Sequence, residues 1–178
     1  MTKNHNINKL SYILCLTFAI ISIGLSSASA QSQDQTGNPN ANLYPVHDPV
    51  MIKQDKTYYL FSTGGGCSSS TDMVNWKNEK NVFDNVPAWI TPDIVKVEWG
   101  NGIAAPDIQY IKGTYYYFYC VSSFAVNTSA IGVATNKTLH QDSPDYKWID
   151  HGMIIQSIPN RDMWNALDPN VIMDGNQG

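Results

Sequence analysis

Residues 107–120 read DIQYIKGTYYYFYC, and this stretch decides the fold that the sequence predicts. It begins with an aspartate, continues with mostly apolar residues, turns at Lys112 and Gly113, and ends in a run of aromatic residues. β-Branched and aromatic residues on both sides of a short polar turn are typical of a β-hairpin. We therefore predict two paired strands, over residues 108–111 and 114–122.

An aspartate followed by mostly apolar residues and a polar turn occurs twice more in the chain, and the aromatic run occurs once more. Residues 48–62 read DPVMIKQDKTYYLFS, and residues 168–178 read DPNVIMDGNQG. The initial residues of the three copies, Asp48, Asp107 and Asp168, are 59 and 61 residues apart. Self-similarity at a fixed period of this size indicates a repeat architecture.

Further strand signals accompany the repeated hairpins. In the first copy, residues 50–53 and 57–63 form the predicted hairpin, and residues 69–76 follow with a turn and a tryptophan. Residues 130–135, AIGVAT, form a run of small apolar residues after the second copy. No part of the repeat region shows the apolar spacing of an amphipathic helix. We predict an all-β chain with roughly four strands per repeat.

A four-stranded unit with this period is typical of a β-propeller blade. A β-sandwich, which also contains many short strands, is the alternative fold. Repetition of aspartate at one phase favours the propeller. The chain would supply about two and a half blades, whereas a closed propeller needs roughly four to eight. We therefore expect the chain to be a fragment or a truncated form of a propeller.

Composition and charge exclude several classes of protein. The 178 residues include 11 Lys+Arg and 15 Asp+Glu, which gives a net charge of −4. An acidic chain is a poor binder of polyanions, so we expect no nucleic-acid partner. Aromatic residues at 11% and hydrophobic residues at 43% are too abundant for a disordered chain. Charged residues at 15% are too few for a coiled coil.

Residues 1–30 are typical of a secretory signal peptide. Lys3 and Lys9 precede an apolar run over residues 11–25, and the segment ends in an Ala-Ser-Ala pattern. A transmembrane anchor is the alternative, but the apolar run is short for a bilayer. We expect a secreted protein, extracellular or periplasmic, with no membrane association after cleavage.

The remaining chain divides into two predicted parts. Residues 31–42 are polar and form a flexible leader, and residues 43–178 form the partial propeller domain. Cys67 and Cys120 lie in the domain beside strand-like segments. They either pair in an oxidising compartment or serve as two small buried apolar residues.

The repeated aspartates indicate a catalytic or cation-binding site. In a propeller, residues at one phase of successive blades converge on one end of the axial channel. Asp48, Asp107 and Asp168 would then point into one cavity, where nearby like charges couple their titrations. Such a cavity serves acid–base catalysis or binds a cation. The alternative is that these aspartates only form turns at strand starts.

Four stretches carry a resemblance to a known family. They are VHDPVMIKQDKTYYLFSTG (46–64), SSTDMVNWK (69–77), APDIQYIKGTYYYFYCVSSFAVNTSAIGVATN (105–136) and WNALDPNVIMDG (164–175). In these stretches the chain resembles glycoside hydrolase family 43, and most closely its endo-α-1,5-L-arabinanases.

The resemblance implies a five-bladed β-propeller that hydrolyses α-1,5-linked arabinan of plant cell walls with inversion at the sugar carbon. It implies that Asp48 is the general base that activates water. Asp168 would raise the pKa of the general acid and orient it. Asp107 would line the funnel and support the site. Phe124 and Asn165 would contact the arabinose units.

Two features depart from the family pattern. The general acid of the family is a Glu in the blade after Asp168, and the chain ends before that position. Glu79 and Glu98 lie in no matching context, so we expect this chain alone to be inactive. The family usually has Trp where this chain has Ala104, so a stacking ring is missing or is replaced by Trp99.

The resemblance also bears on ligands and partners. We expect no cofactor and no metal ligand in this segment, and a structural calcium ion only in the full-length protein. The expected partner is arabinan or a related plant polysaccharide, and the expected state is a monomer. Two alternatives stay open: an arabinofuranosidase or β-xylosidase of the same family, and a propeller that binds glycans without cutting them.

Overall fold

The computed structural model describes residues 45–96, 102–123 and 125–175. Contacts divide the chain into two units, residues 1–38 and residues 39–178, and every described residue belongs to the second. The predicted signal peptide and polar leader lie outside the described residues. Within the described part, no helix is long and apolar enough to cross a membrane.

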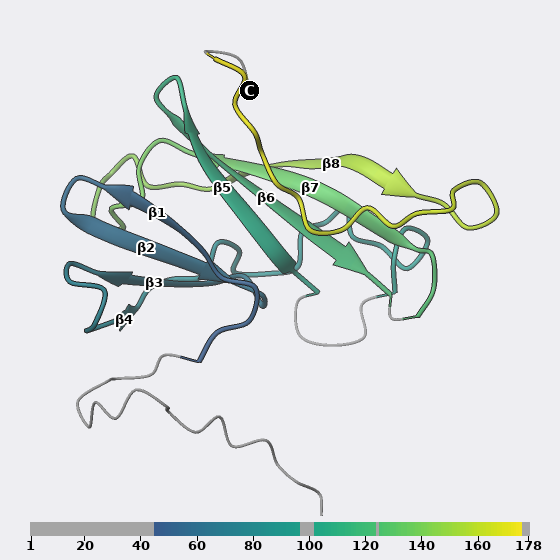
Figure 1. Ribbon diagram of the computed structural model, residues 1–178, viewed down its shortest axis with the longest axis horizontal. Helices are drawn as coiled ribbons and strands as arrows, with labels where there is room; N and C mark the ends of the chain where they lie inside the picture. Colours follow the sequence, from purple (N-terminus) through teal and green to yellow (C-terminus); the bar gives the residue numbers. More distant parts are fainter. Residues whose placement is uncertain (1–44, 97–101, 124, 176–178) are drawn as a thin grey trace, which may run out of the picture. The chain divides into compact units, whose positions relative to one another are not determined.

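Eight strands form two antiparallel sheets, each with its four strands in chain order (Figure 1). The first sheet contains β1 (Val50–Gln54), β2 (Thr57–Ser62), β3 (Gly66–Ser70) and β4 (Lys77–Asn78). The second sheet contains β5 (Ala104–Ile111), β6 (Thr114–Ser122), β7 (Ser129–Asn136) and β8 (Ile149–Ser157). The described residues contain no helix, so the all-β prediction is confirmed.

The sheets correspond to the first two copies of the predicted repeat. Both hairpins occur where the aromatic runs place them, with β1 paired to β2 and β5 paired to β6. The third strand of the first sheet differs from the prediction, because it ends at Ser70 and residues 71–76 form a turn. The Asp72 carboxylate caps this turn by accepting the backbone N–H groups of Val74 and Asn75.

An aromatic core holds the two sheets together. Tyr59 and Phe61 of β2 alternate with more exposed neighbours and face Tyr117 and Tyr119 of β6 in one buried cluster. The ring centroids of Phe61 and Tyr117 are 5.4 Å apart. Phe83, from the connection between the sheets, meets Tyr119 at 5.0 Å. Each such ring buries about 150–250 Å² of surface, so these contacts dominate the packing between the sheets.

The opposite face of the second sheet is also apolar. Tyr116 and Phe118 of β6, Val133 of β7 and Ile154 of β8 line a hollow of about 450 Å³. Ile154 is 50% exposed, although the core face of the same sheet is closed. A sheet with two apolar faces is suited to a place between two other layers. The five-bladed closure stays a prediction.

Both described cysteines are unpaired and buried. Burial raises the pKa of Cys67 to about 12 and that of Cys120 to about 11. Of the two alternatives left by the sequence, the structure therefore shows small buried thiols and no disulfide between them.

Candidate active site

Three strained corners share one backbone geometry. Asp48, Ala105 and Asp168 each precede a proline, and their φ angles of 48°, 40° and 49° lie in the left-handed region. A non-glycine residue in that region costs on the order of 1–3 kcal/mol, which the surrounding structure must offset. A left-handed φ before a proline thus occurs at all three positions, and we take these corners as corresponding points of the repeat.

The first corner fixes the carboxylate of Asp48. Its Oδ2 atom lies 2.7 Å from His47 Nδ1 and accepts a hydrogen bond of 2.8 Å from Thr63 Oγ1. The Thr63 hydroxyl oxygen in turn accepts the backbone N–H of Ala105 at 3.0 Å. The Asp48 side chain is 42% exposed. One carboxylate oxygen is therefore anchored, and the group remains open to water.

The second and third corners meet at the thiol of Cys120. Burial is the main cause that raises the pKa of Cys120, and the negative charges of Asp168 and Asp48 raise it further, while a hydrogen bond with the Asp168 backbone lowers it. The thiol donates to the carbonyl oxygen of Ala104 at 3.2 Å. Both aspartates therefore lie close enough to Cys120 to oppose its ionisation. That their carboxylates share one cavity stays a prediction.

Asp107 occupies a different kind of position. It is 4% exposed, and its Oδ2 atom accepts the backbone N–H of Val171 at 2.7 Å. A register irregularity between Ala104 and Asp107 places Asp107 inside β5, two residues past the corner. The expectation of three carboxylates open to one cavity is thus corrected, because the residue at the common phase is Ala105. Asp107 holds the backbone at Val171 in place. Its contact with substrate stays a prediction.

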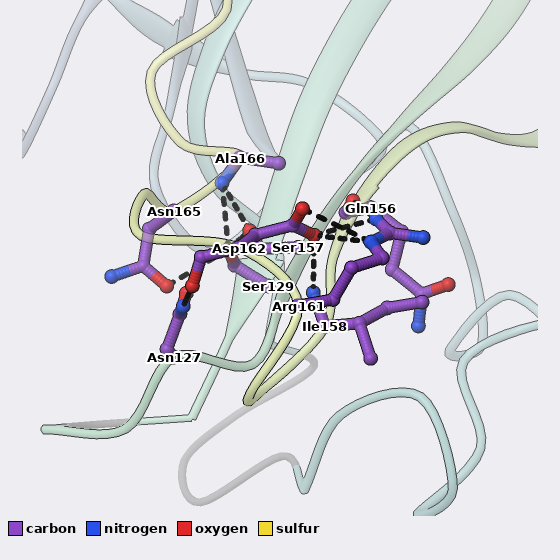
Figure 2. Close-up of polar contacts among 9 residues, drawn as sticks. All are labelled: Asn127, Ser129, Gln156, Ser157, Ile158, Arg161, Asp162, Asn165 and Ala166. Atoms are coloured by element: carbon purple, nitrogen blue, oxygen red, sulfur yellow. Dashed lines mark hydrogen bonds and ion pairs between the residues drawn. The ribbon is translucent and has the colours of Figure 1, made fainter.

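Two buried serines hold the segment of Asn165 and Ala166, as Figure 2 shows. Ser129 of β7 and Ser157 of β8 are fully buried, and their hydroxyl oxygens are 2.8 Å apart. Both accept the backbone N–H of Ala166, at 2.8 and 2.7 Å. Ser129 Oγ is 3.2 Å from Asn165 Oδ1. The exposed amide is thus mounted on a rigid part of the second sheet.

An ion pair stiffens the loop before Asn165. Arg161 Nε lies 2.9 Å from Asp162 Oδ2, which also accepts the backbone N–H of Ile158 at 2.8 Å. Hydrogen bonding from Arg161 holds the pKa of Asp162 below its ordinary value. Asn127 donates its side-chain amide to the Asp162 carbonyl oxygen. The loop is therefore closed on itself at Ile158 and tied to Asn127, which precedes β7 (Figure 2).

A cavity of about 260 Å³ lies in front of this loop. Its lining residues are Ser122, Ser123, Ala125, Val126, Asn165 and Leu167. Phe124, predicted to contact substrate, lies outside the described residues, as do Glu98 and Trp99. Trp164, beside Asn165, is 49% exposed. Asn165 thus combines a cavity with an exposed aromatic neighbour, an arrangement suited to a sugar.

Other parts of the described chain are less suited to catalysis. A hollow of about 420 Å³ is lined by Tyr59, Glu79 and His140 among others, at the far edge of the first sheet. Glu79 is bound there by Ser69 at 2.6 Å and by Lys77 at 3.2 Å. Across the three described ranges, no group of three or more His, Cys, Asp or Glu side chains could hold a metal ion.

The sequence analysis missed three polar residues of the site: Thr63, Ser129 and Ser157. A threonine after an aromatic strand, or a serine within one, looks like any strand residue. Their roles depend on which carboxylate or amide lies opposite, and this follows only from the pairing of strands. The proline that follows each corner is visible in the sequence and could have identified the equivalent positions of the three repeats.

Comparison with known proteins identifies relatives over most of the chain. The model of glycosyl hydrolases family 43 matches residues 39–178. An extracellular exo-α-(1→5)-L-arabinofuranosidase of Cellvibrio japonicus is 50% identical over 131 residues, which cover 72% of this chain and 37% of that protein. An extracellular endo-α-(1→5)-L-arabinanase of Bacillus subtilis is 36% identical over 138 residues, or 72% of this chain and 40% of that protein.

A solved structure agrees with this result. The α-L-arabinanase of Cellvibrio cellulosa, determined in complex with arabinohexaose, has a TM-score of 0.69 and 45% sequence identity to this chain. The match covers 75% of this chain and 42% of that structure. The chain therefore spans less than half the length of each of these relatives.

Proposed function

We propose that the protein of which this chain is a part hydrolyses α-1,5-linked arabinan. The premise is that the chain belongs to glycosyl hydrolase family 43. The proposal is supported by the bond from Thr63 that links the Asp48 carboxylate to the backbone of Ala105, and by the charges of Asp48 and Asp168, which both raise the pKa of Cys120. The names of the relatives support arabinan as the substrate, and one related structure was solved with arabinohexaose.

Asp48 is proposed as the general base. Its anchored oxygen Oδ2 leaves Oδ1 free to take a proton from a water molecule, because the bonds from His47 and Thr63 both fall on Oδ2. The water oxygen then bonds to the anomeric carbon from the face opposite the leaving sugar, and the bond to the glycosidic oxygen breaks. Inversion needs about 6.5–9.5 Å between base and acid, so that this water fits beside the sugar.

The leaving oxygen needs a proton from a general acid. Glu79 is held by Ser69 and Lys77 away from the corners, so it is unsuited to this role. We propose that the acid is a Glu of a later blade and that the negative charge of Asp168 raises its pKa. The fully hydrogen-bonded Ser129–Ser157 pair holds the backbone beside Asp168 in place.

Five-bladed closure is proposed from the exposed apolar face of the second sheet. The hollow of about 450 Å³ over Tyr116, Phe118 and Ile154 is a surface that another sheet would bury. A structural calcium ion on the axis of the closed propeller remains part of this proposal. Secretion is proposed from residues 1–30, and two relatives are named as extracellular proteins.

The mode of cleavage is the finer part of the proposal. The resemblance favours endo cleavage, whereas the relative with 50% identity is named as an exo-acting enzyme and the one with 36% as an endo-acting enzyme. Endo cleavage of linear arabinan gives a spread of oligosaccharides from the first minutes. Exo cleavage gives one short product throughout the reaction.

The test measures sugar release from linear α-1,5-arabinan. This chain and the longest polypeptide that its reading frame encodes are assayed side by side, each with Asp48→Ala as the control. Loss of a general base lowers the rate by roughly 10²–10⁴-fold or more. No release by either polypeptide, or an undiminished rate for Asp48→Ala, would contradict the proposal.

A glycan-binding propeller without catalysis is the second candidate. It is favoured by Ala104, which carries no ring, where the family usually stacks a tryptophan on the sugar. Ala104 is partly buried, and its carbonyl oxygen accepts the Cys120 thiol. Binding of arabinohexaose without release of sugar from arabinan would support this candidate.

A further inference from the structure

The two serines behind Asn165 form a chain of hydroxyl groups with very few free hydrogen-bonding positions. Ser129 and Ser157 are 0% and 1% exposed, so water does not supply partners for them. Each serine has one hydroxyl hydrogen to donate. Both oxygens already accept the N–H of Ala166. The remaining question is where each of the two hydrogens goes.

One arrangement satisfies every group. Ser157 donates to Ser129 across the 2.8 Å between their oxygens, and Ser129 donates to Asn165 Oδ1 at 3.2 Å. Each serine then donates once, and every acceptor in the chain is used.

The opposite arrangement leaves a buried donor without an acceptor. If Ser129 donated to Ser157, Asn165 Oδ1 would lose the hydrogen bond from Ser129, and the exposed amide would be free to turn. The hydrogen of Ser157 would then have no acceptor among the described residues. A buried hydroxyl without a partner is costly, so this arrangement is disfavoured.

The direction of the chain decides what Asn165 offers to the cavity. With Oδ1 bound by Ser129, the nitrogen Nδ2 of Asn165 points away from the serines, as Figure 2 shows. Asn165 lines the cavity of about 260 Å³. The Arg161–Asp162 pair and Asn127 fix the loop independently of any ligand.

We propose that Ser129 is a positioning residue that makes Asn165 a hydrogen-bond donor, so that the cavity selects a ligand oxygen that accepts. Within the proposed function, on which this inference rests, that oxygen is a ring, glycosidic or hydroxyl oxygen of an arabinose unit. A ligand that offers only an N–H or a cationic group at this point is rejected.

The direction of the hydroxyl chain is tested by neutron diffraction on wild-type crystals soaked in D₂O. The expected result is a deuteron on Ser157 pointing to Ser129, a deuteron on Ser129 pointing to Asn165, and an Asn165 ND₂ group facing the cavity. A Ser129 deuteron pointing to Ser157, with ND₂ facing Ser129, overturns the inference. This measurement needs no substrate and no activity.

The selection of an acceptor is tested by calorimetric binding of arabinohexaose to the longest polypeptide that the reading frame encodes. Asn165→Asp keeps the shape and removes both donors, and it should weaken binding roughly tenfold to hundredfold. Ser129→Ala frees the amide to turn and should weaken binding about tenfold. Ser157→Ala is the matched control, because Ser129 can still donate to Asn165.

The pair of serine variants separates positioning from simple stability. Both lose one buried hydroxyl that accepts Ala166, so their melting temperatures should fall by similar amounts. Affinity should fall further for Ser129→Ala than for Ser157→Ala, because only Ser129 donates to Asn165. Equal affinities for the two variants, or full binding by Asn165→Asp, overturn the inference. If the wild type itself does not bind arabinohexaose, the proposed arabinan function fails, and the neutron result still decides the direction of the chain.

Discussion

The two Asp-Pro corners have the same backbone and opposite ways of holding their carboxylates. At the first corner, the Asp48 carboxylate itself is bound by Thr63, and His47 lies 2.7 Å away. At the other, the backbone is fixed through Cys120 and the serine pair behind Ala166. Within the described residues, no hydrogen bond reaches the Asp168 carboxylate.

This difference suggests a division of work between two similar groups. A general base must present one oxygen to a water molecule in a fixed direction, which the bonds to Asp48 Oδ2 achieve. A carboxylate that acts through its charge needs position but little orientation, and a fixed backbone is sufficient for that. The corner at Ala105 repeats the left-handed backbone without a carboxylate, and its N–H donates to the hydroxyl oxygen of Thr63.

The largest expected effect comes from removing the base without changing its shape. Asp48→Asn, in the longest polypeptide of the reading frame, should lower kcat on arabinan by roughly 10²–10⁴-fold. The affinity for arabinohexaose should stay nearly unchanged, because the substitution removes proton acceptance and little contact area. The check is a kinetic and calorimetric comparison with the wild type. A change in affinity alone would show that Asp48 binds substrate and is not the base.

Removing the Asp168 carboxylate should lower the rate less and should change its dependence on pH. Asp168→Asn removes a negative charge that favours the protonated form of a neighbouring acid. We expect kcat/KM to fall by roughly 10–10²-fold, with the high-pH limb of the pH–rate profile moved to lower pH. A profile that keeps its shape would contradict the assignment of a charge effect to Asp168.

Thr63 tests the bond that distinguishes the first corner. Thr63→Val keeps the shape but removes the donor to Asp48 and the acceptor of the Ala105 N–H. The rate should fall about tenfold, and stability should fall by about 1–2 kcal/mol because a backbone donor loses its partner. Thr63→Ser keeps both bonds and should recover most of the rate. Equal loss in both variants would mean that the methyl group, and not the hydroxyl, matters.

The smallest effect concerns the loop before Asn165. Because Arg161 lowers the pKa of Asp162 in the folded protein, the ion pair stabilises the fold above the ordinary pKa of an aspartate, about 3.9. This contribution is lost as pH falls through the lowered value. The melting temperature of Asp162→Asn should therefore be below that of the wild type at pH 6, and the gap should narrow as the pH falls below about 3.9.

An exposed aspartate on a different loop provides the control for this pH series. Asp145→Asn makes the same chemical change without an Arg161 partner. A gap of equal size for Asp145→Asn at pH 6 would show that net charge, and not the ion pair, causes the effect.

The strands were predictable where side chains alternate in type. The aromatic run 114–122 and the hairpin 50–62 identify themselves, because β-branched and aromatic residues fit a half-buried pleat. β3 begins earlier than predicted, since Gly66–Ser70 contains small residues that look like a loop. No strand was predicted over Ile149–Ser157, where Gly152 and polar residues interrupt the pattern. Residues 149–157 form a strand because they pair with β7.

The two Asp-Pro corners of the site were predictable from the sequence. The equivalent position in the middle repeat was not. Counting aspartates selected Asp107, whereas backbone geometry selects Ala105, because a bulge separates the two positions in β5. The contacts of Thr63 and Ser129 arise between residues 15 and 36 positions apart in the chain. Sequence spacing does not show such contacts.

The central claim is that Asp48 and Asp168 converge on one thiol, and NMR titration of Cys120 labelled at Cβ tests it most directly. The wild-type pKa should be about 11. Asp48→Asn and Asp168→Asn should each lower it, because each removes a negative charge that opposes ionisation of the thiol. If either substitution leaves the Cys120 pKa where it was, the two corners do not share one site.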